Sequence, residues 1–141
     1  MAEDVENIKT PVTLEVSTFT TRQVHELDYT FKQATDKEGQ PMGIPRGGTI
    51  TLKVKALNNG NAELLNWMTA AQLYLPGKIK FMRPDDQGNQ MKEIQFSGHC
   101  VEYTEHWEDP DGAKSLAHYE KITISCKEIF VGAVLWYNKW L

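Results

Sequence analysis

The sequence predicts a mainly β protein in which two packed antiparallel sheets form a small β-barrel or sandwich with one flanking α-helix. Three observations predict this fold. Apolar and polar residues alternate with a period of two along several segments, as in strands that bury one face. One stretch near Asn61 instead has apolar residues at helical spacing. The order of strands, one helix and then strands favours a barrel or sandwich with the helix on its flank.

Three strands are expected before the helix. They cover residues 12–16, 24–33 and 49–56. The alternation is clearest in the third, whose inward face is expected to consist of Ile50, Leu52, Val54 and Ala56. The outward positions of that strand are threonines and lysines, so one face of the sheet is expected to meet solvent or a partner.

The single helix is expected to begin at Asn61, whose side chain can cap the first turn, and to place Glu63 at the positive end of the helix dipole. Its buried stripe is expected to contain Leu64, Met68 and Ala71, widened by Leu65 and Trp67. The Pro-Gly pair at 76–77 is expected to end the segment before the next strand begins.

Three further strands follow in the second half of the chain. They are expected at residues 78–83, 91–107 and 119–126, separated by turns at 84–88 and 109–112. The long middle strand is expected to bulge near Gly98. Cys100 and Cys126 are expected to be reduced core residues, because two cysteines are too few for a disulfide framework. In the aromatic segment 130–141, Trp136 and Trp140 fit either the core or an interface.

The segment at residues 34–48 fits no regular element, because it contains four glycines and two prolines. A loop of this length in a small domain is usually functional or disordered. It has little apolar content beyond Met42 and Ile44, so it is expected to add little to the core of its own subunit. We therefore interpret it as a contact loop for another subunit.

The composition excludes several classes of function. With 141 residues, of which 40% are apolar and 24% charged, the chain is expected to form one globular domain over 1–141. A net charge of −4 without a lysine or arginine cluster argues against nucleic-acid binding. The acidic start does not resemble a signal peptide, and no apolar run is long enough for a membrane span, so we expect folding in the cytoplasm.

The residues also argue against an enzyme. The segment 99–109 is rich in His, Cys and carboxylates, but on a regular strand His99 and Glu105 would lie roughly 20 Å apart, too far to share a metal. His99 and Cys100 are adjacent and therefore point to opposite faces, so this pair cannot form an activated nucleophile. No phosphate-binding loop or nucleophile elbow is present. We expect no catalytic residue, no cofactor and no metal.

Several strings, in this order and spacing, resemble the haemolysin-coregulated protein family (Hcp or TssD), in particular its Bacteroidetes-type branch. They are LDYTFKQATD at 27–36, GQP at 39–41, GGTITLKV at 47–54, ELLNWM at 63–68, GKIKF at 77–81, MKEIQF at 91–96 and ITIS at 122–125. The resemblance covers roughly residues 24–126. The tail at 130–141 is more aromatic than the family pattern, and its role stays open.

The resemblance implies a structural subunit of the type VI secretion inner tube. Such subunits form hexameric rings that stack into a hollow tube, meet sheath, spike and effector proteins, and leave the cell without a signal peptide. It also implies that the loop reaches a neighbouring subunit or ring. The expected inter-subunit residues are Thr35, Asp36, Lys37, Glu38, Gln40, Pro41, Met42, Ile44, Pro45 and Arg46. The alternatives are a tail-tube protein of a related contractile injection particle and a monomeric ligand-binding β-barrel.

Overall fold

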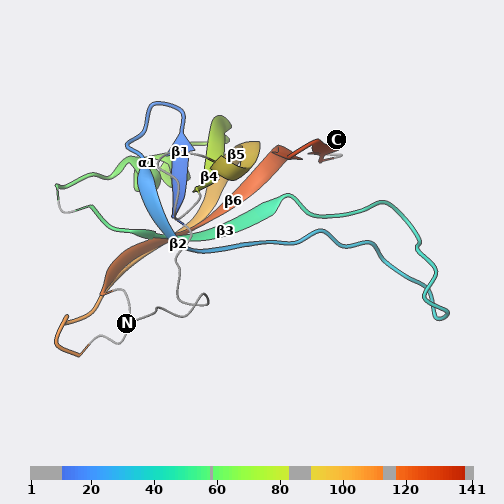
Figure 1. The fold of residues 1–141 in the computed structure, drawn as a ribbon, viewed down its shortest axis with the longest axis horizontal. Helices are drawn as coiled ribbons and strands as arrows, with labels where there is room; N and C mark the ends of the chain where they lie inside the picture. Colours follow the sequence, from blue (N-terminus) through green and yellow to red (C-terminus); the bar gives the residue numbers. More distant parts are fainter. Residues whose placement is uncertain (1–10, 58, 83–89, 113–116, 139–141) are drawn as a thin grey trace.

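The computed structural model describes residues 11–57, 59–82, 90–112 and 117–138, and contains seven strands and one helix in these ranges. In chain order the elements are β1 (Val12–Val16), β2 (Arg22–Tyr29), β3 (Thr49–Lys55), α1 (Glu63–Thr69), β4 (Leu75–Met82), β5 (Gln90–Trp107), β6 (His118–Val131) and β7 (Val134–Tyr137). Figure 1 shows the strands gathered into one body, from which a long connection between β2 and β3 projects.

The strands form a closed antiparallel barrel, which confirms the predicted fold class. They are hydrogen-bonded in the order β3-β2-β1-β4-β5-β6, and a β3–β6 pairing closes the circle. Closure depends on the long strand β6, whose first part pairs with β3 and whose last part pairs with β7. The strand β7 therefore pairs with the last residues of β6, after the part of β6 that pairs with β3.

The barrel interior is filled by the inward-facing half of each alternating strand, as the sequence predicts. Ile50, Leu52 and Val54 of β3 are fully buried. They pack with apolar residues of the other strands, namely Leu14, Val16, Ile79, Ile94, Phe96, Ile122, Ile124 and Ile129. Cys100 and Cys126 are buried free thiols in the same core, as predicted.

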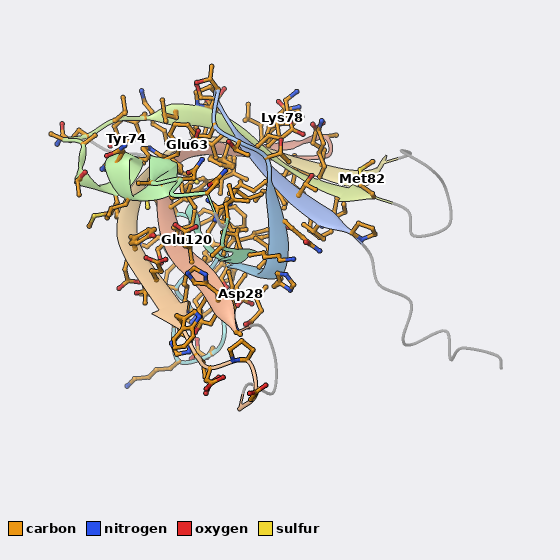
Figure 2. The ribbon with its side chains drawn as sticks, turned by 90° about the vertical axis from the view of Figure 1, so that its left-hand side faces the viewer. Asp28, Glu63, Tyr74, Lys78, Met82 and Glu120 are labelled. Carbon is orange, nitrogen blue, oxygen red and sulfur yellow. The ribbon has the colours of Figure 1, made fainter. Side chains whose placement is uncertain are left out.

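The helix α1 packs beside the barrel, against β5 (Figure 2). Trp67 is its main core residue, with 1% of its surface exposed and its indole N–H donated to the carbonyl of Leu73 at 2.9 Å. Leu64 is also buried, whereas the predicted stripe is wrong at Leu65 and Ala71, which are exposed. The cause is the shortness of the helix, which offers only about two turns to the core.

The element boundaries differ from the predicted ones at several places. The strand predicted at 24–33 is wrong at its end, because β2 covers Arg22–Tyr29 and the connection to β3 leaves the barrel after it. The N-cap of α1 is Ala62, one residue after the predicted cap Asn61. The Asn61 side-chain oxygen still accepts the backbone N–H of Glu63, the first residue of the helix. Pro76 and Gly77 lie inside β4, where Gly77 makes room for the Phe96 ring across the sheet. β6 extends to Val131, beyond the predicted end at 126.

The turn at 109–112 and the bulge at Gly98 are confirmed. The turn predicted at 84–88 and residue Trp140 lie outside the described residues. In the part of the chain that is described, no helix has the length and apolar character needed to cross a bilayer.

Candidate assembly surfaces

The connection between β2 and β3, residues 30–48, is a hairpin-like extension that we call the arm. Figure 1 shows it leaving the barrel along the long axis of the molecule. Its two sides pair with each other, since the Lys32 N–H donates to the Arg46 carbonyl at 2.7 Å and the Met42 N–H to the Ala34 carbonyl at 2.7 Å. The predicted irregular loop is thus a two-sided structure held by its own backbone hydrogen bonds.

The turn at the end of the arm is organised by one carboxylate. Asp36 accepts the backbone N–H groups of Glu38 and Gln40, each at 2.9 Å. Gly39 follows with a φ of +83°, a backbone conformation that other residues rarely adopt. This short turn keeps the two sides of the arm together at their far end.

The base of the arm is fixed to β7. The Phe31 ring packs against the Trp136 ring with centroids 5.3 Å apart. Gly48 has a φ of +90°, and a Cβ there would lie 2.5 Å from the Trp136 ring, so only glycine fits. The Gly48 carbonyl also accepts the Cys126 N–H at 2.6 Å. Trp136 is therefore half-buried and packs against the base of the arm and the core of its own subunit.

Beyond its base, the arm makes its surface available to a partner. Met42 and Ile44 are 54% and 50% exposed, although both are apolar. The structure places all ten predicted contact residues on the arm, and all except the half-buried Asp36 are exposed. It thereby brings them together in one projecting element.

The hairpin that joins β5 to β6 lies at the other end of the molecule (Figure 1). We call residues 107–117 the β5–β6 tip, of which 113–116 are not described. Trp107 is 64% exposed, and Glu108, Asp109 and Asp111 follow it directly. The Asp109 carboxylate accepts the Asp111 N–H at 3.1 Å, which orders the turn. Sequence reasoning interpreted these carboxylates only as turn residues.

A groove of about 520 Å³ crosses the outer face of the sheet formed by β1, β4, β5, β6 and β7. One side of it is polar, with Glu15 and Lys78. The other side is apolar, with the exposed side chains of Phe130, Leu135 and Tyr137. These residues belong to the aromatic tail that the sequence singles out, and the groove gives that tail an exposed face beside the packed Trp136.

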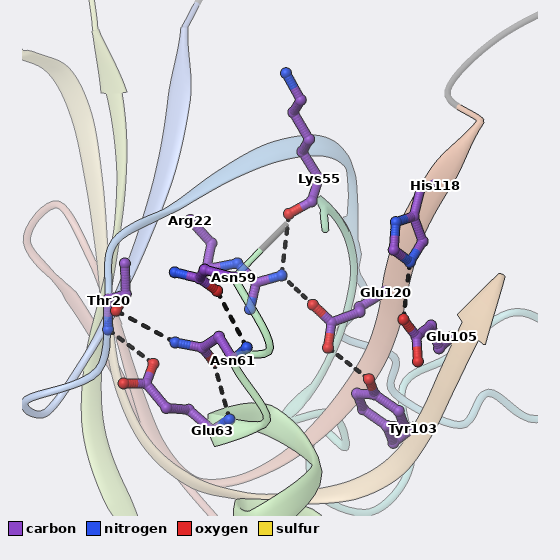
Figure 3. Close-up of polar contacts among 10 residues, drawn as sticks. All are labelled: Thr20, Arg22, Lys55, Asn59, Asn61, Glu63, Tyr103, Glu105, His118 and Glu120. Carbon is purple, nitrogen blue, oxygen red and sulfur yellow. Dashed lines mark hydrogen bonds and ion pairs between the residues drawn. The ribbon is translucent and has the colours of Figure 1, made fainter. Parts of the chain in front are cut away.

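A buried polar network lies near the start of β2, the end of β3 and the start of β6, which are the strand ends away from the arm (Figure 3). The Arg22 guanidinium pairs with the Glu120 carboxylate and donates to the Lys55 carbonyl at 3.0 Å. The Tyr103 hydroxyl donates to the other Glu120 oxygen at 2.5 Å. Burial, reinforced by this bond to Glu120, raises the pKa of Tyr103 above its ordinary value. The network joins β2, the end of β3, β5 and β6.

Sequence reasoning missed this network, although one signal was available. Glu120 has the same strand parity as Ile122 and Ile124, so the alternation that buries those residues also turns Glu120 inward. A buried carboxylate requires a cation, but the position of Arg22 before the predicted strand gave no indication of its partner.

Two of the histidines form hydrogen bonds within the subunit. His99 donates its Nδ1 proton to the Leu73 carbonyl at 2.9 Å, and His118 pairs with Glu105 at 2.8 Å. No cluster of three or more His, Cys, Asp or Glu side chains occurs among the residues described. Burial raises the pKa of Cys100 to about 11 and that of Cys126 to about 12, so both thiols stay protonated near neutral pH.

Comparison with protein families identifies one family. A family model described as Hemolysin coregulated protein Hcp (TssD) matches residues 8–141. A comparison with curated proteins found no match.

Solved structures give the same result. Hcp1 from Flavobacterium johnsoniae superimposes with a TM-score of 0.81 at 28% identity, over 91% of this chain and 99% of that one. Hcp1 from the E. coli EAEC 042 pathovar gives a TM-score of 0.70 at 14% identity, over 94% of this chain and 100% of that one. The anti-feeding prophage tube-terminating cap gives 0.54 at 15% identity, over 95% of both chains. The last two likenesses concern the fold alone.

Proposed function

Because the chain belongs to the Hemolysin coregulated protein Hcp (TssD) family, we propose that it is a structural subunit of the type VI secretion inner tube. In this role it assembles as hexameric rings that stack into a hollow tube and carry effectors. The observation that carries the proposal is the family match over residues 8–141, together with a barrel that superimposes on Hcp1 from Flavobacterium johnsoniae at a TM-score of 0.81.

The structure supports a building block more than a ligand carrier or an enzyme. A ligand-binding barrel needs an interior cavity, whereas the interior of this barrel holds packed side chains such as Ile50, Ile79, Ile94 and Ile122. The groove on the outer face and the projecting arm instead provide two separate surfaces for contacts between copies. The role proposed here is structural, with no catalytic step.

The proposed partners are the other copies of the chain and the sheath, spike and effector proteins of the secretion machine. We propose that the chain folds in the cytoplasm as one domain and is then expelled from the cell with the tube. The tail-tube protein of a related contractile particle is the second candidate, since the anti-feeding prophage cap has a similar fold. The higher TM-score of Flavobacterium johnsoniae Hcp1 and the family match favour the type VI tube.

Ring formation is the first test of this proposal. Light scattering and native mass spectrometry of the purified protein are expected to show a ring of six 16.1 kDa chains. A species of one chain at tens of micromolar would contradict a tube subunit and would favour the monomeric barrel.

The arm is proposed to be the contact between subunits of neighbouring rings, with Met42 and Ile44 as its apolar anchors. Replacement of residues 37–46 by a short Gly-Ser linker is expected to leave the melting temperature nearly unchanged, because their side chains are exposed and their described hydrogen bonds join them to other residues of the arm rather than to the barrel. The variant is expected to form rings but no tubes, and to lose secretion.

A milder variant separates arm chemistry from arm length. Met42→Ser with Ile44→Ser removes both apolar anchors and is expected to weaken stacking of the rings. The matched control is Leu65→Ser with Val101→Ser, which removes two similarly exposed apolar side chains elsewhere in the molecule, one on α1 and one on β5. Normal tubes and secretion from the linker variant would refute the assignment of the arm.

A further inference from the structure

The last strand of the sheet, β7, has a free edge. It is hydrogen-bonded to β6, and no other described strand pairs with it. The Asn138 N–H donates to the Lys127 carbonyl at 2.8 Å, so Asn138 and every second residue before it direct their backbone groups toward β6. Leu135 and Tyr137 lie between those positions, and their N–H and C=O groups point away from β6. Among the described residues, nothing forms a hydrogen bond with these groups.

The side chains along this edge are apolar and exposed. The sequence of β7 is Val-Leu-Trp-Tyr, in which Val134, Leu135 and Tyr137 are 69%, 42% and 54% exposed. Proteins commonly protect an open strand edge with a lysine or a proline, and β7 contains neither. Free backbone groups beside exposed apolar side chains are the two features of a site that accepts an added strand.

Leu135 and Tyr137 also form the apolar side of the groove. Together with Phe130 of β6 they line the hollow of about 520 Å³ on the outer face of the sheet. Phe130 lies directly opposite Leu135, and Glu128 directly opposite Tyr137, so the four side chains share this face. A strand added at the edge of β7 would place every second side chain on the same face, against this apolar surface.

Glu128 gives the site a charge. It lines the groove and is exposed, and within the described residues it forms no ion pair. The two other charged residues that line the groove already have partners, since Glu15 lies 2.8 Å from Lys80 and Lys78 lies 3.9 Å from Glu93. An occupant that carries a lysine or an arginine would therefore complement the remaining carboxylate.

The distance from the free edge to this carboxylate fits a long basic side chain. Neighbouring strands lie about 4.8 Å apart, so a strand beside β7 would run about 10 Å from β6. A lysine or arginine opposite Tyr137 can lay its apolar stem along the Tyr137 ring and bring its charge to Glu128. An aliphatic residue two positions away then meets Leu135 on the same face.

We propose that the free edge of β7 binds an extended segment of a partner protein. The segment adds as an antiparallel strand, the more stable arrangement per residue, with a basic residue opposite Tyr137 and an aliphatic residue opposite Leu135. A basic segment suits a partner better than a copy of this chain, whose net charge is −4. The polar side of the groove, with Glu15 and Lys78, stays available to a neighbouring copy. This contact does not depend on the proposed function.

A synthetic peptide tests the contact on the purified protein. The probe is the N-acetylated and C-amidated peptide Thr-Lys-Thr-Val-Thr-Val-Thr-Lys-Thr, whose lysines and valines share one face of a strand. Binding is measured by calorimetry at about 0.1 M salt. Hydrogen exchange at single-residue resolution then follows the backbone amides of Leu135 and Tyr137. Their exchange is expected to slow at least about tenfold at saturating peptide, whereas that of Trp136, whose amide faces β6, is expected to change little.

N-methylation of the probe distinguishes strand addition from simple apolar binding. In an antiparallel pair the peptide residues opposite Leu135 and Tyr137 exchange both backbone bonds with them, so the N–H groups of the valines and lysines face β7. Methylation of the valine and lysine nitrogens is expected to weaken binding at least about tenfold. The matched control is methylation of the three internal threonine nitrogens, which face solvent, and it is expected to weaken binding less than about threefold.

Charge reversal tests the role of Glu128. The probe is expected to bind Glu128→Lys about fivefold more weakly at about 0.1 M salt, and this difference is expected to shrink at about 1 M salt. A peptide with glutamates in place of both lysines is expected to bind Glu128→Lys better than it binds the wild type. The control variant Glu108→Lys makes the same charge change at an exposed carboxylate just beyond the far end of β5 and is expected to bind like the wild type.

Three results would overturn the proposal. The first is the absence of binding at peptide concentrations up to about 1 mM. The second is equal weakening by the two methylation patterns, which would show a contact without strand pairing. The third is slow exchange at Leu135 and Tyr137 in the protein without peptide that becomes fast when its assemblies are dissociated, because a second copy would then occupy the edge.

Discussion

Removal of the Glu120 carboxylate is the sharpest test of the interior of the barrel. Arg22 and Glu120 are only 2% and 3% exposed, and they form the buried ion pair of Figure 3. Among the described residues, the Arg22 guanidinium in Glu120→Ala keeps a single bond, to the Lys55 carbonyl, and its Nε already has no hydrogen-bond partner there. An uncompensated charge at such a site costs about 3–5 kcal/mol of folding free energy.

The measurement is urea unfolding followed by tryptophan fluorescence at one fixed protein concentration, because the stability of an oligomer depends on concentration. The matched control is Glu26→Ala, which removes an exposed carboxylate that pairs with Lys53 at 3.1 Å. Because that pair lies at the surface, the control is expected to lose no more than about 1 kcal/mol.

A double substitution separates the charge from the shape of the side chain. Arg22→Met with Glu120→Leu replaces both charges by apolar groups and is expected to be far more stable than Glu120→Ala, since buried ion pairs often exchange for apolar residues without loss. The reasoning would be refuted by a Glu120→Ala loss below about 1 kcal/mol. It would equally be refuted by a double variant as unstable as the single one.

Three other substitutions or treatments test the core and the arm base. Trp67→Ala is expected to lose about 3–5 kcal/mol in chemical unfolding, and a loss below about 1 kcal/mol combined with failed ring assembly would place Trp67 at an interface. Gly48→Ala is expected to lower the melting temperature, because the new Cβ meets the Trp136 ring at a positive φ; an unchanged melting curve would contradict this. Cys100 and Cys126 are expected to resist iodoacetamide at about pH 8 until the protein is unfolded. Their raised pKa values stabilise the fold below the ordinary thiol pKa, and this contribution is expected to disappear as the pH rises toward about 11–12.

Much of the barrel could be predicted because its strands obey one simple rule. In β3 the alternation of Ile50, Leu52 and Val54 with threonine and lysine identifies the buried face without knowledge of any neighbour. The same rule correctly places Cys100 and Cys126 in the core. The failures occur where a residue's position depends on a distant partner rather than on its own pattern.

Pro76 and Gly77 illustrate such a failure. By themselves they indicate a break in the chain, yet β4 accepts them because the Phe96 ring from β5 fills the space that a side chain at Gly77 would take. The arm is another case, since its glycines and prolines conceal the backbone bonds between Lys32 and Arg46 that make it a hairpin. Cross-strand pairing of this kind is not encoded in a local period.

The fixed base of the arm bears directly on how a tube subunit of this kind would assemble. A free segment of this length would lose much of its conformational freedom on docking, and that loss would oppose the contact. The contacts of Gly48 and Phe31 with Trp136 restrict the arm in advance, so less freedom remains to be lost when a partner binds. The residue that holds the arm therefore lies in the aromatic tail, almost ninety positions after Gly48 in the sequence. Substitutions in β7 should consequently affect stacking even where they leave the groove unchanged, and the arm and the tail act as one structural unit.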